Sequence, residues 1–285
     1  MVKRRSKKRS GKVSDDYIHS YLDTLYEHDR RLFYYMRSVI IKYISFYKKL
    51  NPGQLSAISY YKGPGYQSIN SLLLNQPNYI LSSSNILSSN GRILNMKDVT
   101  TYLTHLFTTL IQHIQQLDSV FDNRPSISRK LMVYRGVKNS LFIEELLHNK
   151  HIGDVIVLHN YVSTSLNPQV ALQYSGYYNM TVDTSFNKSI LFRIKLPKNT
   201  PCLYIPYNND ISTQKFIVDE GELLLNRGSK FKIRRIQTKK YPKHEYHSTL
   251  SSYTIYDLDY IGYDRSPLKS VDDYVSTIRS IQYYI

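Results

Sequence analysis

Apolar residues recur at helical spacing in the first half of the chain. The clearest stripe fits one face of a helix at every step and comprises Leu103, Leu106, Phe107, Leu110, Ile111, Ile114 and Leu117. Weaker stripes predict helices over residues 14–40, 55–61 and 66–72. Asn51-Pro52-Gly53 and the Ser-, Asn- and Gly-rich residues 75–97 indicate loops.

Near residue 130 the pattern changes to short runs rich in Val, Ile, Leu and Phe. In two of them apolar and basic residues alternate, which predicts strands with one buried face. The runs are 131–134, 155–158, 189–196, 222–225 and 230–236. Asn226-Arg227-Gly228-Ser229 joins the last two and predicts a hairpin turn. A helical half followed by a strand-rich half predicts an α+β fold, with helices against one side of an antiparallel or mixed sheet.

The composition narrows the class of protein. The 28 tyrosines supply much of the apolar bulk, and each hydroxyl needs a partner or water, so we expect a core that is amphipathic at its margins. Cys202 is the single cysteine, which excludes an intramolecular disulfide and fits a reducing compartment. The chain has neither an apolar run long enough for a transmembrane helix nor an ordinary secretory signal. We therefore expect an intracellular monomer without membrane contact.

The formal charge is +16, and seven of the basic residues lie within the first twelve positions. Such a block repels itself, so residues 1–13 are predicted to form a disordered basic tail. A nuclear address, an arm that binds nucleic acid and a solubilising tail all fit this composition. The rest of the chain keeps a charge of +9, which favours an anionic ligand or partner.

Arginine and glycine close the first predicted strand, in Val133-Tyr134-Arg135-Gly136. A glycine in a strand lets a ligand approach the backbone closely, and an arginine can hold a phosphate through two parallel hydrogen bonds. Taken alone, the motif fits a surface arginine at a strand end better than a ligand-binding residue.

Hydroxyl groups follow the second predicted strand, in Tyr161-Val162-Ser163-Thr164-Ser165. In an extended chain Ser163 and Ser165 share one face, and Thr164 lies on the other. The serines are suited to bonding a ribose or orienting a carboxylate, although such triplets are also common in β proteins.

Two glutamates enter an apolar strand, because Asp219-Glu220-Gly221-Glu222 runs directly into three leucines. In a strand, Glu220 and Glu222 would point the same way, and Gly221 would leave the opposite face clear. Like charges beside a buried strand destabilise it unless cations or ligand groups compensate them. This favours a functional site over a solvated strand end.

In this order, Arg135, Ser163-Thr164-Ser165 and Glu220-x-Glu222 resemble the Arg–Ser–Glu class of mono-ADP-ribosyltransferases. The likeness is closest to the enzymatic domains of clostridial binary toxins and to related bacterial and viral proteins. It also includes Leu55–Leu74, with Gly63-Pro64-Gly65-Tyr66 and Ile69-Asn70, and residues 153–165, 190–197 and 220–233. The resemblance implies N-terminal helices packed on two small, roughly perpendicular β-sheets with an NAD cleft between them.

The resemblance also implies a domain organisation. Residues 14–240 would form the ADP-ribosyltransferase domain, with a helical part at 14–120 and a core at 50–236. Residues 241–285 would be a C-terminal extension whose role the sequence leaves open.

By resemblance, NAD is the co-substrate and no metal takes part. Arg135 would hold an NAD phosphate, and the backbone of Gly136 would bond the nicotinamide amide. Ser163 would orient Glu222, which would bond the nicotinamide-ribose hydroxyls and stabilise an oxocarbenium-like transition state as nicotinamide leaves.

Further residues of the expected NAD site are less closely matched. Thr164 and Ser165 belong to the same triplet as Ser163, and Tyr174 aligns with the family's stacking aromatic residue. The chain is longer than the toxin pattern between Ser165 and Ser189, where Lys188 would supply the family's basic residue.

The resemblance assigns the choice of acceptor to Glu220. In this class a glutamate two residues before the catalytic one accompanies arginine as acceptor, whereas glutamine accompanies asparagine or other acceptors. The guanidinium of arginine, whose pKa lies far above neutral so that it stays protonated, is a poor nucleophile until a carboxylate engages it. The segment from Pro206 to Asp219 would face the protein acceptor, with Phe216 as an aromatic contact.

The expected activity is therefore NAD-dependent protein-arginine mono-ADP-ribosylation. An NAD glycohydrolase, in which water replaces the acceptor, is one alternative. A non-catalytic basic protein that binds nucleic acid on the same fold is another, motivated by the charge. Because the toxins' companion domain for cell entry is absent from this sequence, we expect an effector that is either made in the cell it modifies or delivered there by another component. Its place there would be the nucleus, or the virion of a host-infecting agent.

Overall fold

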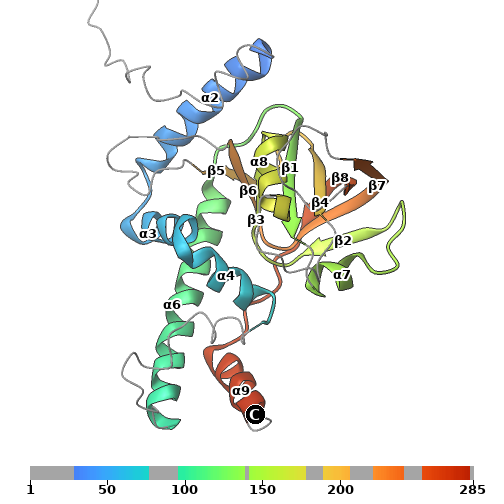
Figure 1. Cartoon of the computed structure of the whole chain (residues 1–285). Helices are drawn as coiled ribbons and strands as arrows, with labels where there is room; N and C mark the ends of the chain where they lie inside the picture. Colours follow the sequence, from blue (N-terminus) through green and yellow to red (C-terminus); the bar gives the residue numbers. More distant parts are fainter. Residues whose placement is uncertain are drawn as a thin grey trace, which may run out of the picture.

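The computed structural model describes residues 29–76, 96–138, 141–177, 189–205, 221–240 and 252–282. Helices fill the first part of the chain and strands the later part, which confirms the predicted α+β class (Figure 1). The predicted basic tail, residues 14–28 and residues 77–95 lie outside the described ranges.

The N-terminal helices follow the apolar stripes. The described ones are α2 (Arg30–Tyr47), α3 (Pro52–Tyr60), α4 (Tyr66–Leu73) and α6 (Met96–Asn123), with an irregular turn, η2 (Tyr61–Gly65), between α3 and α4. Asn51 caps α3 through a reciprocal pair of hydrogen bonds with Gln54, and Pro52 occupies its first turn. The predicted stripe over 103–117 lies entirely within α6, so this helix is confirmed.

The strands form one mixed sheet in the order β2-β7-β8-β4-β1-β3-β6-β5. Their bounds are β1 (Leu131–Lys138), β2 (Val155–Leu158), β3 (Val162–Ser165), β4 (Ser189–Leu196), β5 (Cys202–Tyr204), β6 (Glu222–Leu225), β7 (Ser229–Lys240) and β8 (Ser252–Tyr263).

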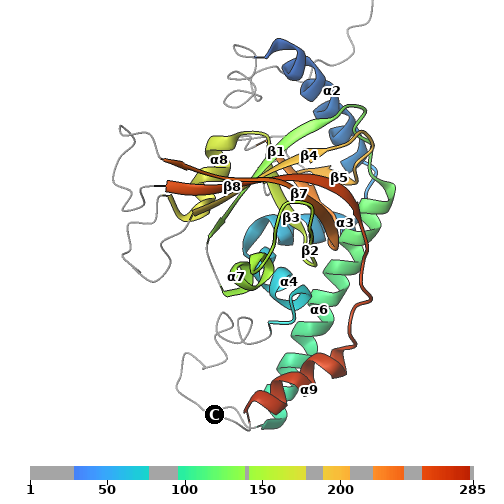
Figure 2. The ribbon, with the colours of Figure 1, turned by 90° about the vertical axis from the view of Figure 1, so that its right-hand side faces the viewer.

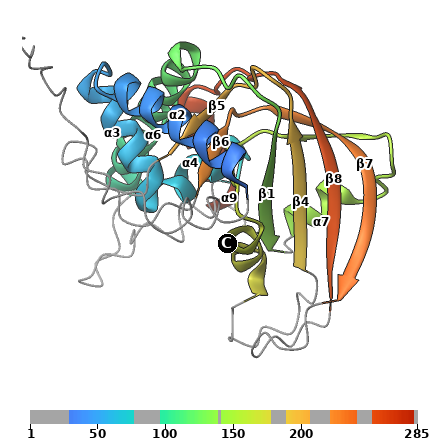
Figure 3. The same cartoon turned by 90° about the horizontal axis from the view of Figure 1, so that it is seen from above.

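The family resemblance predicts two sheets, but in the structure a single pair of residues joins the two parts into one continuous sheet. Strands β1 and β3 are joined at Tyr134↔Ser165, whereas β1 and β4 pair along their whole length. A five-stranded part, from β2 to β1, thus meets a three-stranded part, β3-β6-β5. Figure 3 shows β1, β4, β8 and β7 side by side, with the N-terminal helices gathered around β5 and β6.

Strand β8 lies inside the sheet, between β4 and β7. It is parallel to β4 and antiparallel to β7. Helix α9 (Val271–Gln282) then packs against α6, where the rings of Phe107 and Tyr274 lie 5.6 Å apart (Figure 2). The described residues after 240 therefore complete the sheet and cover the longest helix.

The expected hairpin at residues 226–229 is wrong. These residues do form a turn, in which Gly228 has φ = 72°. However, β6 pairs with β3 and β5, while β7 pairs with β2 and β8. The turn therefore carries the chain from one part of the sheet to the other. Within it, Arg227 forms an ion pair with Asp118 of α6, which holds the turn against that helix.

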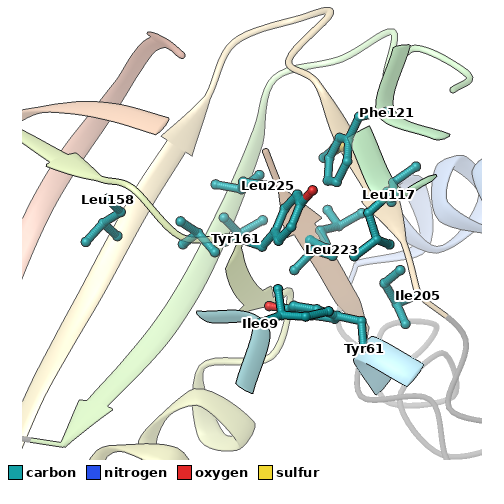
Figure 4. Packing of buried hydrophobic residues seen from close by; sticks show 14 of the residues in the cluster. Tyr61, Ile69, Leu117, Phe121, Leu158, Tyr161, Ile205, Leu223 and Leu225 are labelled. Carbon is teal, nitrogen blue, oxygen red and sulfur yellow. The ribbon is translucent and has the colours of Figure 1, made fainter. Parts of the chain in front are cut away.

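One core cluster extends from the N-terminal helices across both parts of the sheet, and its centre lies between α6 and the three-stranded part. The ring of Tyr161 stacks on Phe121 at 5.6 Å and lies among the side chains of Leu117, Leu223 and Leu225 (Figure 4). Its hydroxyl donates to Asp118 Oδ1 of α6 at 2.7 Å and lies 3.2 Å from the carbonyl oxygen of Ile114, which fits the expected amphipathic core. Among the described helices, none is long and apolar enough to cross a membrane.

Helix α2 covers the edge strand β5 with two buried tyrosines whose hydroxyls bond backbone carbonyls of that strand. Tyr43 donates its hydroxyl proton to the carbonyl of Cys202 (2.6 Å), and Tyr47 donates to that of Tyr204. An edge strand with free carbonyls can pair with another chain, so these tyrosines protect it.

Three short elements complete the described fold. They are α7 (Leu141–Leu147), α8 (Pro168–Leu172) and η3 (Gln173–Tyr177). Ala171 of α8 packs with Leu191 of β4 and Ile255 of β8. Elements α8 and η3 therefore cover one end of the five-stranded part, on the face that carries Leu191 and Ile255.

Candidate active site

Glu222 begins strand β6 in the three-stranded part of the sheet. It is charged and buried, with 7% of the residue exposed. The N–H groups of Leu166 and Ile205 donate to the carbonyls of Gly221 and Glu222, both at 3.0 Å, and fix the start of the strand. Gly221, just before the strand, has φ = 59°, a backbone conformation that favours glycine. Glu220 lies outside the described residues, so its expected direction relative to Glu222 stays a prediction.

Ser163 of β3 hydrogen-bonds the carboxylate of Glu222. Its Oγ donates to Oε1 at 2.6 Å. Ser165 pairs with Glu222 and Ser163 pairs with Leu224, so Ser163 and Glu222 are diagonal neighbours on one face of the sheet. The short bond holds the carboxylate in one orientation.

The other two hydroxyls of the triplet have different partners. Thr164 Oγ1 donates to the carbonyl of Leu223 at 2.6 Å, on the opposite face. Ser165 Oγ accepts from the N–H of Asn167 at 2.9 Å, at the residue that caps α8. Thr164 thus ties β3 to β6, and Ser165 fixes the connection to α8.

Arg135 reaches this carboxylate region from β1. Its Nη1 donates to the carbonyl of Ser163 at 2.9 Å. Burial lowers the pKa of Arg135, while the neighbouring Tyr61 and Glu222 act in the opposite direction. The structure therefore brings together Arg135, Ser163 and Glu222, three of the residues that the sequence singles out.

Lys62 is a fourth member of the cluster. From η2, its Nζ lies 2.5 Å from Glu222 Oε2, and the two side chains are 14% and 9% exposed. With Ser163 on Oε1, both carboxylate oxygens have a donor. Lys62 is not among the residues predicted from the sequence, because a lysine before Gly63-Pro64-Gly65 has the composition of a solvated loop.

The backbone of η2 is held firmly around Lys62. Tyr61 is buried, and its ring meets that of Tyr161 edge-on at 5.6 Å (Figure 4). A Cβ on Gly65 would lie 2.3 Å from the ring of Tyr60, so only glycine allows this approach. The chain between α3 and α4 thus presents Lys62 to β6 from a fixed position.

Polar aromatic and amide groups surround the cluster. Burial, followed by the nearby charge of Glu222, raises the pKa of Tyr47, and burial also raises that of Tyr61. Asn70 Nδ2 donates to the hydroxyl of Tyr61 at 3.3 Å. Asn70 Oδ1 is buried with no hydrogen-bond partner in the described part of the chain, which fits a site that receives a polar ligand.

Gly136 lies beneath α8 and η3. A Cβ there would come within 1.7 Å of the carbonyl oxygen of Ala171 and 2.7 Å of the backbone nitrogen of Ser175. The glycine is therefore required for helix packing, in addition to any contact with a ligand. Tyr174, the expected stacking residue, lies on η3 and is 58% exposed.

Four expected features lie outside the described residues. They are Glu220, Phe216, the segment from Pro206 to Asp219, and Lys188. Their assignment stays a prediction from the sequence.

A separate hollow of about 290 Å³ lies on the other face of β1 and β4. Tyr134 lines it, and the alternation of β1 directs Arg135 away from it. Its polar lining is mixed in charge and consists of Arg193, Lys195, Arg234, Asp257 and Asp259. The hollow is therefore distinct from the Glu222 cluster.

Comparison with solved structures relates this fold to bacterial toxins. Vis, an ADP-ribosyltransferase from Vibrio splendidus, is 19% identical with a TM-score of 0.50, over 88% of this chain and 92% of that one. BECa, an ADP-ribosylating toxin of C. perfringens solved with NADH, is 18% identical with a TM-score of 0.51. That match covers 81% of this chain and 48% of BECa. At these identities the likeness concerns the fold.

A family model gives the more specific result. No curated protein sequence matches this chain. The model for the ADP-ribosyltransferase exoenzyme, however, matches residues 41–254, a range that includes Lys62, Arg135, Ser163 and Glu222. The chain belongs to the ADP-ribosyltransferase exoenzyme family.

Proposed function

We propose that this protein transfers ADP-ribose from NAD to an arginine side chain of another protein and releases nicotinamide. Membership of the family supports NAD as the substrate and ADP-ribosyl transfer as the reaction. The observation that carries the site assignment is the buried carboxylate of Glu222, oriented by Ser163 and placed beside Arg135.

Glu222 is the group suited to cleaving the bond to nicotinamide. As that bond breaks, positive charge develops on the ribose, and a fixed carboxylate lowers the energy of this state. Ser163 keeps the carboxylate in one orientation before the reaction begins, so little reorganisation is needed. In this proposal Glu222 also accepts hydrogen bonds from the ribose hydroxyls.

Arg135 and Gly136 would bind the rest of the nucleotide. The guanidinium of Arg135 uses one donor on Ser163 and has further N–H groups for a phosphate. In the five-stranded part, Gly136 pairs with Leu191, and its other backbone edge lies beyond the single β1–β3 pair at Tyr134. A nicotinamide amide bonded to that edge would lie next to Arg135.

Arginine is proposed as the acceptor because residue 220 is a glutamate. A carboxylate can engage a guanidinium through two hydrogen bonds and raise its nucleophilicity, which an amide does less well. Vis, which shares the fold, has been crystallised with agmatine, a small guanidinium compound. Phe216 would contribute an aromatic contact with the acceptor.

The test is incubation of the full chain with labelled NAD and cell lysate, with released nicotinamide and labelled protein measured together. Glu222→Gln should lower nicotinamide release by about 10²–10³-fold. Glu145→Gln, on the exposed face of α7, is the matched control and should leave the rate unchanged. Equal rates in Glu222→Gln and wild type would refute the role of Glu222.

A second variant separates transfer to arginine from hydrolysis. Glu220→Gln should abolish labelling of proteins and of added agmatine but keep nicotinamide release. If the wild type releases nicotinamide and labels nothing, the protein is an NAD glycohydrolase. If it does neither, a non-catalytic role is left, and binding to nucleic acid through the basic residues 1–13 is then the assay to run. Nuclease treatment of a labelled product would reveal a nucleic-acid acceptor.

A further inference from the structure

The ion pair between Lys62 and Glu222 joins segments 160 positions apart in the sequence. Lys62 contacts Oε2 while Ser163 contacts Oε1, so each carboxylate oxygen has one partner in the protein without ligand. Nothing in the proposed cleavage of NAD requires this lysine.

The pair conflicts with the electrostatics of the proposed reaction. Glu222 has to stabilise positive charge on the ribose, and an ammonium in contact with the carboxylate cancels much of its field. The same ammonium would repel the developing cation. The arrangement seen without ligand is therefore different from the one that suits the transition state.

The local charge indicates where the ammonium can go. Lys62 and Arg135 are two cations around the single carboxylate of Glu222, so this group of three carries an excess positive charge. NAD brings two phosphates into the site. A lysine ammonium is a compact charge on a flexible stem, so it can change partners while the backbone of η2 stays fixed by Tyr61 and Gly65.

We propose that Lys62 is a phosphate-binding residue that is stored on Glu222 until NAD arrives. On binding, its ammonium moves from Oε2 of Glu222 to a phosphate oxygen of the nicotinamide half of NAD. The carboxylate is then free to face the ribose. Lys62 thus couples occupation of the phosphate position to release of Glu222. This inference rests on the proposed NAD site.

The test is calorimetric titration of the full chain with two probes. NADH carries the phosphates, and nicotinamide riboside carries the cationic nicotinamide and its ribose without any phosphate. Lys62→Met should weaken NADH binding by about 10–100-fold, the effect of losing one charged hydrogen bond. The same variant should bind nicotinamide riboside at least as tightly as wild type, because Glu222 no longer has to give up its ion pair with Lys62 before it faces the ribose.

Two further variants distinguish an effect on ligand binding from an effect on folding. Lys62→Arg retains the cation and should keep NADH affinity within about threefold of wild type, less than half the effect of a charged hydrogen bond. Lys42→Met removes an exposed lysine from α2 and should bind both probes as wild type does. Thermal unfolding without ligand compares the stability of all three variants. In turnover, Lys62→Met should raise KM for NAD without lowering kcat.

The outcomes separate this inference from the proposed function. If wild type binds NADH and cleaves NAD while Lys62→Met binds NADH equally well, Lys62 does not bind phosphate. If Lys62→Met weakens both probes alike, the ion pair only maintains the shape of the site, and the inference is overturned. If wild type neither binds NADH nor cleaves NAD, the proposed function fails and takes the inference with it.

Discussion

The two ends of strand β6 each carry buried charge, but the charges are held in different ways. At its start, Glu222 has one short ion pair with Lys62 and one hydrogen bond from Ser163. Just beyond its end, Arg227 donates to both carboxylate oxygens of Asp118, at 2.8–3.1 Å, and to the carbonyl of Ser266 at 2.6 Å.

The second cluster has more members than the first. Arg265 also contacts Asp118 and Asp122, and Tyr161 donates its hydroxyl proton to Asp118 at 2.7 Å. Burial lowers the pKa of Arg227, but its hydrogen bonds with Asp118 and the charge of that carboxylate raise it more. This cluster joins α6, the β6–β7 turn and the segment before α9. Many mutual contacts indicate a structural role, whereas few contacts leave room for a ligand.

The largest effect is expected at the Asp118 cluster. Asp118→Ala leaves Arg227 buried without its partner, so the free energy of unfolding should fall by about 3–5 kcal/mol. Asp257→Ala is the control, since its pair with Arg193 is more exposed and should contribute about 1 kcal/mol or less. Denaturant unfolding measures both. Equal losses of stability would show that the Asp118 cluster stabilises the fold no more than the exposed Asp257–Arg193 pair does.

A smaller effect, this time on rate, is expected at the Glu222 end. Ser163→Ala removes a hydrogen bond to a charged group, so NAD cleavage should slow by about 10–100-fold. Thr164→Ala is the matched control, because its hydroxyl bonds the carbonyl of Leu223 and should affect stability more than rate. A larger loss of rate in Thr164→Ala would contradict this division between the two residues.

Tyr161 tests whether the two clusters act independently. Its hydroxyl bonds Asp118, while its ring contacts Tyr61 beside Lys62. Tyr161→Phe keeps the ring, so unfolding should become easier by about 0.5–1.5 kcal/mol with no change in the rate of NAD cleavage. A fall in rate as well would mean that the clusters are coupled through this side chain.

The smallest effect is a pH dependence at His113, which stacks on Tyr60 next to η2 with ring centroids 4.4 Å apart. Burial lowers the pKa of His113, so the unfolded chain takes up a proton more readily than the folded one. Its contribution to stability is complete above the unfolded pKa of about 6.5 and is lost as pH falls through the lowered folded value. Unfolding measured from neutral to acidic pH should therefore show a smaller loss in His113→Gln than in wild type. An identical pH profile would exclude His113 as a contributor.

Local patterns predict much of this fold and the centre of its site. The stripe from Leu103 to Leu117 and the apolar runs of β2, β4 and β6 are confirmed, because a buried face imposes a short period on the sequence. Ser163, Arg135 and Glu222 could be selected because each interrupts an apolar pattern, although β1 continues to Lys138, so Arg135 lies inside the strand and not at its predicted end.

Features that depend on distant segments are not visible in the sequence. Strand β8 alternates tyrosine, aspartate and few aliphatic residues, and its burial follows from pairing with β4 and β7. Likewise, η2 contacts β6 only in the folded chain, so Lys62 has no local signal. The hairpin at residues 226–229 failed for the same reason, since Asp118 and Ser266 decide the direction of the chain after Arg227.

The central position of β8 has a consequence for the order of synthesis. A ribosome that has produced everything up to β7 has made a chain in which β4 and β7 cannot yet meet, because the strand between them is missing. Both strands then expose unpaired backbone groups, which invite association with other nascent chains. The five strands can pair completely only after Tyr263, the last residue of β8, has left the exit tunnel of the ribosome. A premature stop near residue 240 would therefore yield an aggregating fragment rather than a smaller enzyme.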